Sequence, residues 1–155
     1  MPPMNLLIIF AAKYLFLVSI LLAGWFFFTL NNILKKKFFT LTLASSVLAF
    51  GIAKLLGAIF NNPRPFVLDH VKPLITHAAD NGFPSDHTLL AMTIASVVFV
   101  YNRKLGIVLA VISFAVGYSR VLAGVHHFID IVGAIGIAIV TVLAIKSLIR
   151  KMVHS

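Results

Sequence analysis

Cysteine is absent from this chain of 155 residues, which excludes a disulfide framework, a thiol nucleophile and a thiolate metal site. Charged residues are scarce too, at 11% of the chain against roughly 25% in an ordinary soluble domain. Hydrophobic residues make up 61%, more apolar surface than a soluble core of this size can bury. The composition therefore predicts one membrane-embedded domain over residues 1–155, with lipid covering the remaining apolar surface.

Acidic residues are the rarest charged class. Only 4 Asp and Glu stand against 13 Lys and Arg, which gives a formal net charge of +9. In a soluble protein this balance would suggest a nucleic-acid partner. Here the basic residues cluster between apolar runs, as they do beside anionic lipid headgroups. We therefore expect a membrane, and no nucleic acid, as the partner.

Five apolar runs suit helices that cross a bilayer, which takes about 20 residues each. They are residues 6–30, 38–60, 88–101, 105–118 and 128–149. The third and fourth are short, so we expect the polar residues 85–87 and 119–120 to continue these helices at the interface. A cleavable signal peptide is the alternative for the first run, but that run exceeds a typical apolar signal region and no small-residue cleavage site follows it. The pattern predicts an all-α integral membrane bundle of about five transmembrane helices.

Basic residues cluster at three positions along this pattern: residues 35–37, residues 103–104 and residues 146–151. All three fall on one side of a five-span chain, and the positive-inside tendency makes that side cytoplasmic. Segments 61–83 and 119–127 then lie outside, and most histidines and all four acids fall in or beside them. Loops are also simply where polar residues go. We nevertheless expect a multi-pass protein of the cell inner (plasma) membrane, with its active site at the outer interface.

The first polar motif outside is Asn61–Phe66, in which Pro63 and Pro65 flank a lone Arg64. Proline on both sides stiffens the chain, and a rigid guanidinium fork suits bidentate binding of a phosphate. An ordinary interfacial anchor is the alternative for Arg64.

The second motif, Phe83–Thr88, opens the third apolar helix. Ser85 is a natural N-cap after Pro84, so free backbone N–H groups there can point at an anion. A plain capping sequence would explain these residues equally well. His87 favours a function, because an ionisable side chain about half a turn into a membrane helix is costly.

The third motif combines Ser119 and Arg120 with His126 and Asp130. His126 and Asp130 are four residues apart on one helix face, so the carboxylate can accept the Nδ1 proton and leave Nε2 unprotonated. This arrangement is typical of an activated imidazole nucleophile or base. A structural His–Asp pair that caps the helix is the alternative. His127 is assigned no role.

Together, the three motifs resemble the type 2 phosphatidic acid phosphatase superfamily. Its pattern joins Lys-x6-Arg-Pro, Pro-Ser-x-His and Ser-Arg-x5-His-x3-Asp, and the third element is matched in full by Ser119–Asp130. The run Pro63–Val67, the run His77–Asp80 and the Asp86 variant of the second element look like the bacterial undecaprenyl-diphosphatase branch. That branch recycles the carrier lipid of cell-wall peptidoglycan synthesis.

One position departs from the family pattern. The residue seven before Arg64 is Gly57 rather than lysine, and the nearest lysine is Lys54, roughly on the same helical face. Lys54 could reach a phosphate, snorkel to the interface, or pair with Asp69 or Asp80. Asp86, where many members carry glycine, is assigned no role.

The resemblance implies a metal-independent lipid phosphatase without a cofactor. His126 would attack phosphorus to form a phosphohistidine, Asp130 would hold its tautomer, and His87 would protonate the leaving oxygen and then activate water. The residues expected to bind the phosphate are Arg64, Ser85, Ser119, Arg120 and Lys54. Undecaprenyl diphosphate is the expected substrate, with lipid A 1-phosphate, phosphatidylglycerol phosphate and phosphatidic acid as alternatives.

Two other classes of function remain open from the sequence. A metal-dependent hydrolase would use His87, His126 and Asp130 as ligands. A non-enzymatic transporter or scaffold subunit would use the intramembrane charges to line a path. Apolar helix faces serve lipid and partner subunits alike, so no oligomeric state is predicted.

Overall fold

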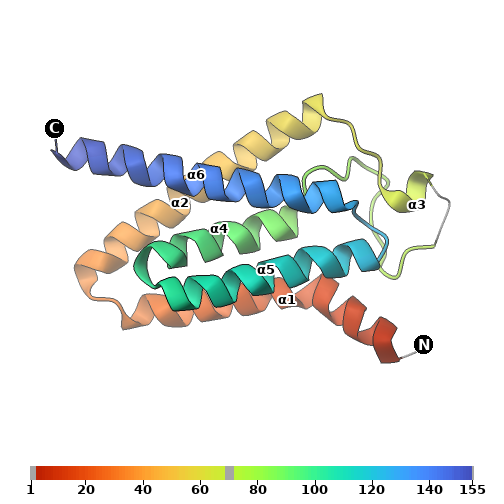
Figure 1. Ribbon diagram of the computed structural model, residues 1–155, viewed down its shortest axis with the longest axis horizontal. Helices are drawn as coiled ribbons and strands as arrows, with labels where there is room; N and C mark the ends of the chain where they lie inside the picture. The colour runs from red at the N-terminus through yellow and green to blue at the C-terminus, as the bar shows by residue number, and fades with distance from the viewer. Residues whose placement is uncertain (1–2, 69–71, 155) are drawn as a thin grey trace.

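The computed structural model describes residues 3–68 and 72–154, which form a bundle of helices (Figure 1). The helices are α1 (Pro3–Thr29), α2 (Asn32–Ile59), α3 (Pro65–Leu68), α4 (Asp86–Tyr101), α5 (Arg103–Leu122) and α6 (Phe128–His154). Four of them, α1, α2, α5 and α6, are long and apolar enough to cross a membrane, and α4 is a shorter apolar helix. The prediction of an all-α membrane bundle is confirmed; of the five predicted transmembrane helices, four are long enough to span and the fifth, α4, is shorter.

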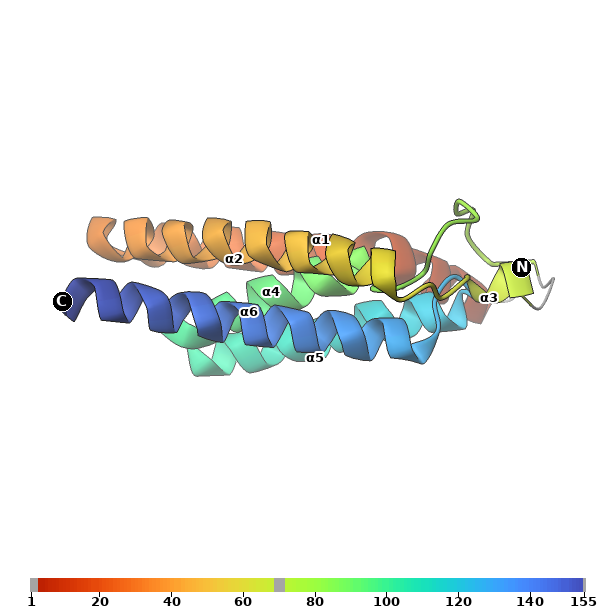
Figure 2. The ribbon, with the colours of Figure 1, turned by 90° about the horizontal axis from the view of Figure 1, so that it is seen from above.

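The short helix α4 lies at the centre of the bundle. It packs against α1, α2, α5 and α6, and Figure 2 shows it between a layer of α1 and α2 and a layer of α5 and α6. Nine of its 16 residues are buried, on all sides of the helix. A helix that is apolar all round suits such a position. Because protein covers most of α4, its length is not set by the thickness of the bilayer.

Two helices begin earlier than the apolar runs predicted. The lysines at 35–37 lie inside α2, and Arg103 and Lys104 open α5, where the sequence suggested loops. Asparagine caps explain both starts: the side chain of Asn31 accepts a hydrogen bond from Leu34 N (2.9 Å), and that of Asn102 accepts one from Leu105 N (3.0 Å). As predicted, α5 continues through residues 119–120, whereas Ser85 stays outside α4.

The segments between α2 and α4 and between α5 and α6 meet at one end of the bundle, which we call the loop end (Figure 1). Leu74 N donates to the carbonyl oxygen of Ala123 across the two segments (3.0 Å), and Pro63 forms an isolated bridge with Asn81. The α1–α2 and α4–α5 turns lie at the opposite end, the basic end, which carries the lysines and arginines of residues 35–37 and 103–104 (Figure 1). The fold thus gathers all three polar motifs at one end.

Candidate active site

A cavity of about 250 Å³ opens at the loop end. Its lining comes from α2, α4, α5 and both connecting segments: Ala53, Lys54, Gly57, Arg64, His77, Asp80, Asn81, Phe83, Pro84, Asp86, His87, Arg120 and His126. Five residues that the sequence singled out for catalysis or phosphate binding therefore share one cavity, namely Lys54, Arg64, His87, Arg120 and His126. Three of the five are lysine or arginine, which outnumber the two aspartates of the lining, Asp80 and Asp86, so the cavity suits an anion.

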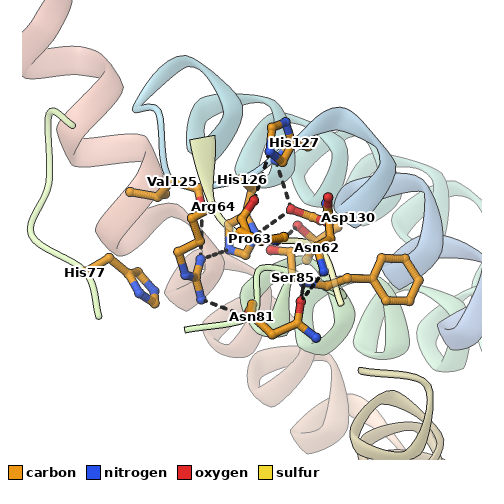
Figure 3. A network of polar contacts seen from close by, with 12 residues as sticks. Asn62, Pro63, Arg64, His77, Asn81, Ser85, Val125, His126, His127 and Asp130 are labelled. Carbon is orange, nitrogen blue, oxygen red and sulfur yellow. Dashed lines mark hydrogen bonds and ion pairs between the residues drawn. The ribbon is translucent and has the colours of Figure 1, made fainter. Parts of the chain in front are cut away.

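His126 and Asp130 form the predicted pair, but not on one helix face, because α6 begins at Phe128 and His126 lies in the segment before it. His126 Nδ1 lies 3.1 Å from Asp130 Oδ2, and both side chains are buried (Figure 3). The carboxylate also accepts hydrogen bonds from the backbone N–H of His127 (2.9 Å) and from Asn62 Nδ2 (2.7 Å). Three donors hold Asp130 in one orientation, and that orientation fixes the imidazole of His126.

The second ring nitrogen of His126 contacts Arg64. Arg64 Nη1 lies 3.2 Å from His126 Nε2. A guanidinium group only donates hydrogen bonds, so Nε2 must be the acceptor and the ring proton belongs on Nδ1, facing Asp130. The contacts on both sides of the ring therefore favour the tautomer with a free electron pair on Nε2, at the wall of the cavity.

Burial lowers the pKa of His126, and the positive charges of Arg120 and Arg64 lower it further. The hydrogen bond and negative charge of Asp130 raise the pKa, but the net shift is downward from the ordinary value of 6.5. The imidazole is therefore neutral at pH 7. A neutral imidazole with its electron pair on Nε2 is the form that can attack an electrophile.

Arg64 is held rigidly, as its two flanking prolines led us to expect. Its Nε donates to Asp80 Oδ1 (2.7 Å), its Nη1 to the Val125 carbonyl oxygen (2.8 Å) and its Nη2 to the Asn81 carbonyl oxygen (3.5 Å). Although some burial raises the pKa of Asp80, the hydrogen bond and charge of Arg64 bring it below the ordinary carboxyl value. Asp80 is thus ionised and orients the fork, which is buried while still lining the cavity.

Arg120 reaches the cavity from the last turns of α5. Its Nη1 donates to the carbonyl oxygen of Ala12 in α1 (3.0 Å), which ties α1 to the site. Its buried Nε has no hydrogen-bond partner among the described residues. An unsatisfied buried donor is costly, and an anion in the cavity would supply acceptors for such a group.

His87 lines the same cavity from the first turn of α4. The ring of Phe16 in α1 packs edge-on against its imidazole, with 4.8 Å between the ring centroids. This aromatic contact limits the orientations that the imidazole can adopt, and leaves its ring nitrogens available to a ligand.

The two serines of the motifs lie beside the cavity and do not line it. Ser85 occupies the N-cap position of α4, but its side chain makes no capping hydrogen bond; its Oγ accepts one from Thr88 Oγ1 (3.1 Å). Ser119 Oγ donates to the Val116 carbonyl oxygen of its own helix (2.7 Å). The expectation that Ser85 and Ser119 contact a phosphate therefore requires a change of side-chain rotamer.

The structure explains why glycine stands where the family pattern has lysine. A Cβ atom on Gly57 would lie 2.8 Å from the carbonyl oxygen of Phe83, too close for any side chain without a shift of the backbone. Lys54, one turn earlier in α2, is exposed and lines the cavity. Asp80 pairs with Arg64 instead of Lys54, and Asp69 lies outside the described residues. These positions favour the interpretation in which Lys54 serves the anion site.

Two asparagines hold the site together, and neither was among the predicted site residues. Asn62 fixes Asp130, as described above. Asn81 Oδ1 accepts hydrogen bonds from the backbone N–H groups of Asn62 (2.9 Å) and Phe83 (3.1 Å), and its Nδ2 donates to the Phe60 carbonyl oxygen (3.0 Å). The Asn81-Gly82 dipeptide is a turn signal, but no local pattern says what the turn connects.

Among residues 3–68 and 72–154, no three His, Asp or Glu side chains are grouped so that they could share a metal ion. Both ring nitrogens of His126 are already engaged, by Asp130 and by Arg64. The predicted alternative in which His87, His126 and Asp130 form a metal-ligand set does not match this geometry.

The structure thus defines a class: multi-pass membrane bundles with a buried His–Asp pair beside an arginine-lined cavity at one end. The family model of the PAP2 superfamily matches residues 37–153. The chain belongs to this superfamily, and the family resemblance inferred from the motifs is confirmed.

Two relatives and one solved structure place the chain within the superfamily. It is 36% identical over 135 residues to the bacitracin transport permease protein BcrC of Bacillus licheniformis, covering 83% of this chain and 63% of that protein. It is 36% identical over 121 residues to the undecaprenyl-diphosphatase BcrC of Bacillus subtilis (strain 168), covering 78% and 61%. The chain thus spans about three fifths of the length of these curated relatives. The crystal structure of Aquifex aeolicus LpxE matches with a TM-score of 0.74 and 26% identity, over 93% of this chain and 86% of that one.

Proposed function

We propose that this protein hydrolyses the phosphate group of a membrane lipid through a phosphohistidine intermediate. The observation that carries the proposal is the position of His126. Its Nδ1 faces the buried carboxylate of Asp130, while its Nε2 meets the guanidinium of Arg64 at the wall of a cationic cavity. A nucleophile of this kind, surrounded by permanent positive charge, suits phosphoryl transfer.

In the first step, Nε2 of His126 attacks phosphorus and the bond from phosphorus to the leaving oxygen breaks. His87 donates a proton to that oxygen, and Asp130 stabilises the positive charge on the imidazole of His126. In the second step, the now neutral His87 takes a proton from water, the hydroxide attacks phosphorus, and the bond between phosphorus and Nε2 breaks. Inorganic phosphate leaves and both histidines return to their starting forms.

The charge on the transferring group is stabilised by Arg64, Arg120 and Lys54, with smaller contributions from Ser85 and Ser119 after rotation. Arg64 also affects the nucleophile directly, because in the free protein its Nη1 donates a hydrogen bond to the lone pair of His126 Nε2. Phosphate oxygens compete for the same guanidinium, so substrate binding draws Arg64 away from His126 and exposes the nucleophile.

Undecaprenyl diphosphate is the substrate we propose, because a relative at 36% identity is named an undecaprenyl-diphosphatase. The cavity supports this choice: His77 lines it in addition to the groups assigned to the transferring phosphate, so a second phosphate has a partner of its own. A polyprenyl tail fits the bilayer beside the helices. The bacterial inner membrane, with the loop end facing outward, is the location we propose, because the lysines and arginines of residues 35–37 and 103–104 lie at the opposite end.

Phosphate release by the purified protein in detergent tests this proposal. The panel comprises undecaprenyl diphosphate, lipid A 1-phosphate, phosphatidylglycerol phosphate and phosphatidic acid, each with and without EDTA and vanadate. We expect the diphosphate to be preferred, EDTA to have no effect, and vanadate, which resembles pentavalent phosphorus, to inhibit. Preference for another lipid of the panel would overturn the substrate assignment alone, whereas loss of activity with EDTA would overturn the mechanism.

The acid side of the pH profile follows from the lowered pKa of His126. Only the neutral imidazole attacks, so kcat/KM should fall as pH decreases through a pKa below 6.5. The measurement is kcat/KM between pH 4 and pH 9 for a lipid diphosphate and a lipid monophosphate. A limb centred above pH 7 with both substrates would contradict the assignment.

A further inference from the structure

A second, larger cavity lies far from the candidate active site. Its volume is about 720 Å³, and its lining is mostly apolar side chains of α4, α5 and α6, such as Phe99, Val111 and Leu143. In Figure 1, α5 and α6 diverge towards the basic end, with α4 between them. Several of the lining side chains, including Val111 (65%) and Leu143 (58%), are highly exposed, so the cavity is a groove open to the bilayer.

Two cations, Arg103 and Lys146, line the groove at the basic end. Arg103 is the first residue of α5, and its guanidinium lies 5.9 Å from the centre of the Phe99 ring. Neither cation forms an ion pair with a carboxylate anywhere in the described part of the chain. The groove therefore combines a long apolar surface with positive charge at one end.

The length of the groove matches one leaflet of a membrane. Along α5 its lining runs from Arg103 to Phe114, which is about 17 Å at 1.5 Å per residue. Half of a hydrocarbon core of about 30 Å is about 15 Å. A lipid with its headgroup at Arg103 and Lys146 would thus place its acyl chain along the groove to about the middle of the bilayer.

A second copy of this chain is a poor occupant. Copies in the same membrane share one orientation, so a neighbour would bring its own basic end to the same depth. Of the four acids, Asp80, Asp86 and Asp130 lie at the loop end, and Asp69 lies outside the described residues. No described acidic side chain of a neighbour would therefore face Arg103 and Lys146. An anionic headgroup supplies the missing charge.

We propose that this groove is a binding site for an anionic glycerophospholipid, separate from the active site. The phosphate lies between Arg103 and Lys146, and one acyl chain follows the apolar walls of α4, α5 and α6. The lipids meant are phosphodiesters such as phosphatidylglycerol, which lack the terminal phosphate that the proposed reaction removes. The site stands whether or not the protein is a phosphatase.

Native mass spectrometry of the full chain, delipidated in detergent, tests the site. The probes are phosphatidylglycerol and phosphatidylcholine with identical acyl chains. Each cation near the membrane surface strengthens binding of an anionic lipid by about 1 kcal/mol, which is about fivefold. Arg103 and Lys146 together should therefore make phosphatidylglycerol bind about thirtyfold more tightly than phosphatidylcholine. The double variant Arg103→Gln/Lys146→Gln should lose this preference and bind both lipids equally.

Two control variants separate the groove from general surface charge. Lys36→Gln/Lys37→Gln removes the same charge from the basic end but not from the groove, so the preference should persist. Ala110→Phe fills the apolar part and should weaken both lipids alike. Circular dichroism checks that each variant keeps its helix content. The proposal would be overturned if the wild type bound the two lipids equally, or if the Lys36→Gln/Lys37→Gln control lost the preference to the same extent as the groove variant. It would also be overturned if the wild type formed dimers without bound lipid and Ala110→Phe abolished those dimers.

Discussion

Replacement of His126 by alanine should abolish phosphate release from lipid substrates, with a loss of roughly 10⁴-fold to 10⁶-fold in kcat, as when an enzyme loses its nucleophile. The reason is direct: Nε2 of His126 is the atom that bonds to phosphorus in the mechanism proposed above. Steady-state kinetics with purified protein in detergent measure the loss. A small effect on KM is expected, because Arg64, Arg120 and Lys54 remain to bind the phosphate.

The adjacent histidine provides a matched control. The side chain of His127 contacts the Pro63 carbonyl oxygen (3.1 Å) and does not line the cavity. His127→Gln keeps a donor for that contact and should retain near-normal activity. If the folded His126→Ala variant, as judged by its thermal unfolding, kept its phosphate release, the phosphohistidine mechanism would be wrong.

Replacement of Asp130 by asparagine should lower kcat by roughly 10³-fold to 10⁴-fold, the size of the effect when the aspartate of a Ser-His-Asp triad is changed in this way. The amide can donate its own proton to Nδ1 of His126. This donation would move the imidazole proton to Nε2 and block the nucleophile. The negative charge that stabilises the imidazolium in the transition state would also be lost.

The Asp130→Asn variant distinguishes a catalytic pair from a structural one. An amide oxygen at the Oδ1 position can keep the hydrogen bond from Asn62. The amide nitrogen that donates to Nδ1 then gives up only the backbone hydrogen bond from His127 at Oδ2 (2.9 Å), a cost of about 1–3 kcal/mol. Thermal unfolding of Asp130→Asn should therefore change far less than its kcat. A variant with normal kcat and a greatly lowered Tm would show that the pair only caps the helix.

The parts of the molecule that the sequence predicts are those with a local signal. Long apolar runs define the membrane helices, because each must cover its own length with apolar side chains. The spacing of His126 and Asp130 predicts their contact, although His126 lies just before α6 and not on a helix face shared with Asp130. Arg64 and His87 are marked by their motifs. These residues meet in one cavity because successive helices alternate in direction, so the segments that carry the three motifs lie at the same end of the bundle.

The parts that the sequence does not predict depend on how two distant segments fold onto each other. The hydrogen bonds of Arg64 to Asp80 and to the Val125 carbonyl oxygen join residues 16 and 61 positions apart. The same is true of Asn62, whose partner Asp130 lies 68 positions away. Gly57 is an example. The sequence shows that the residue is glycine, but not that the Phe83 carbonyl oxygen lies so close that no side chain would fit there.

The central claim is that His126 carries the phosphoryl group during turnover. Rapid quenching of the enzyme with lipid diphosphate labelled at its terminal phosphate, followed by peptide mapping under alkaline conditions, tests it directly. If His126 forms a phosphohistidine, we expect an acid-labile, alkali-stable label on the peptide that contains His126. The label should form within one turnover and be absent from His126→Ala. A label on another residue, or full-rate phosphate release with no labelled protein at any quench time, would contradict it.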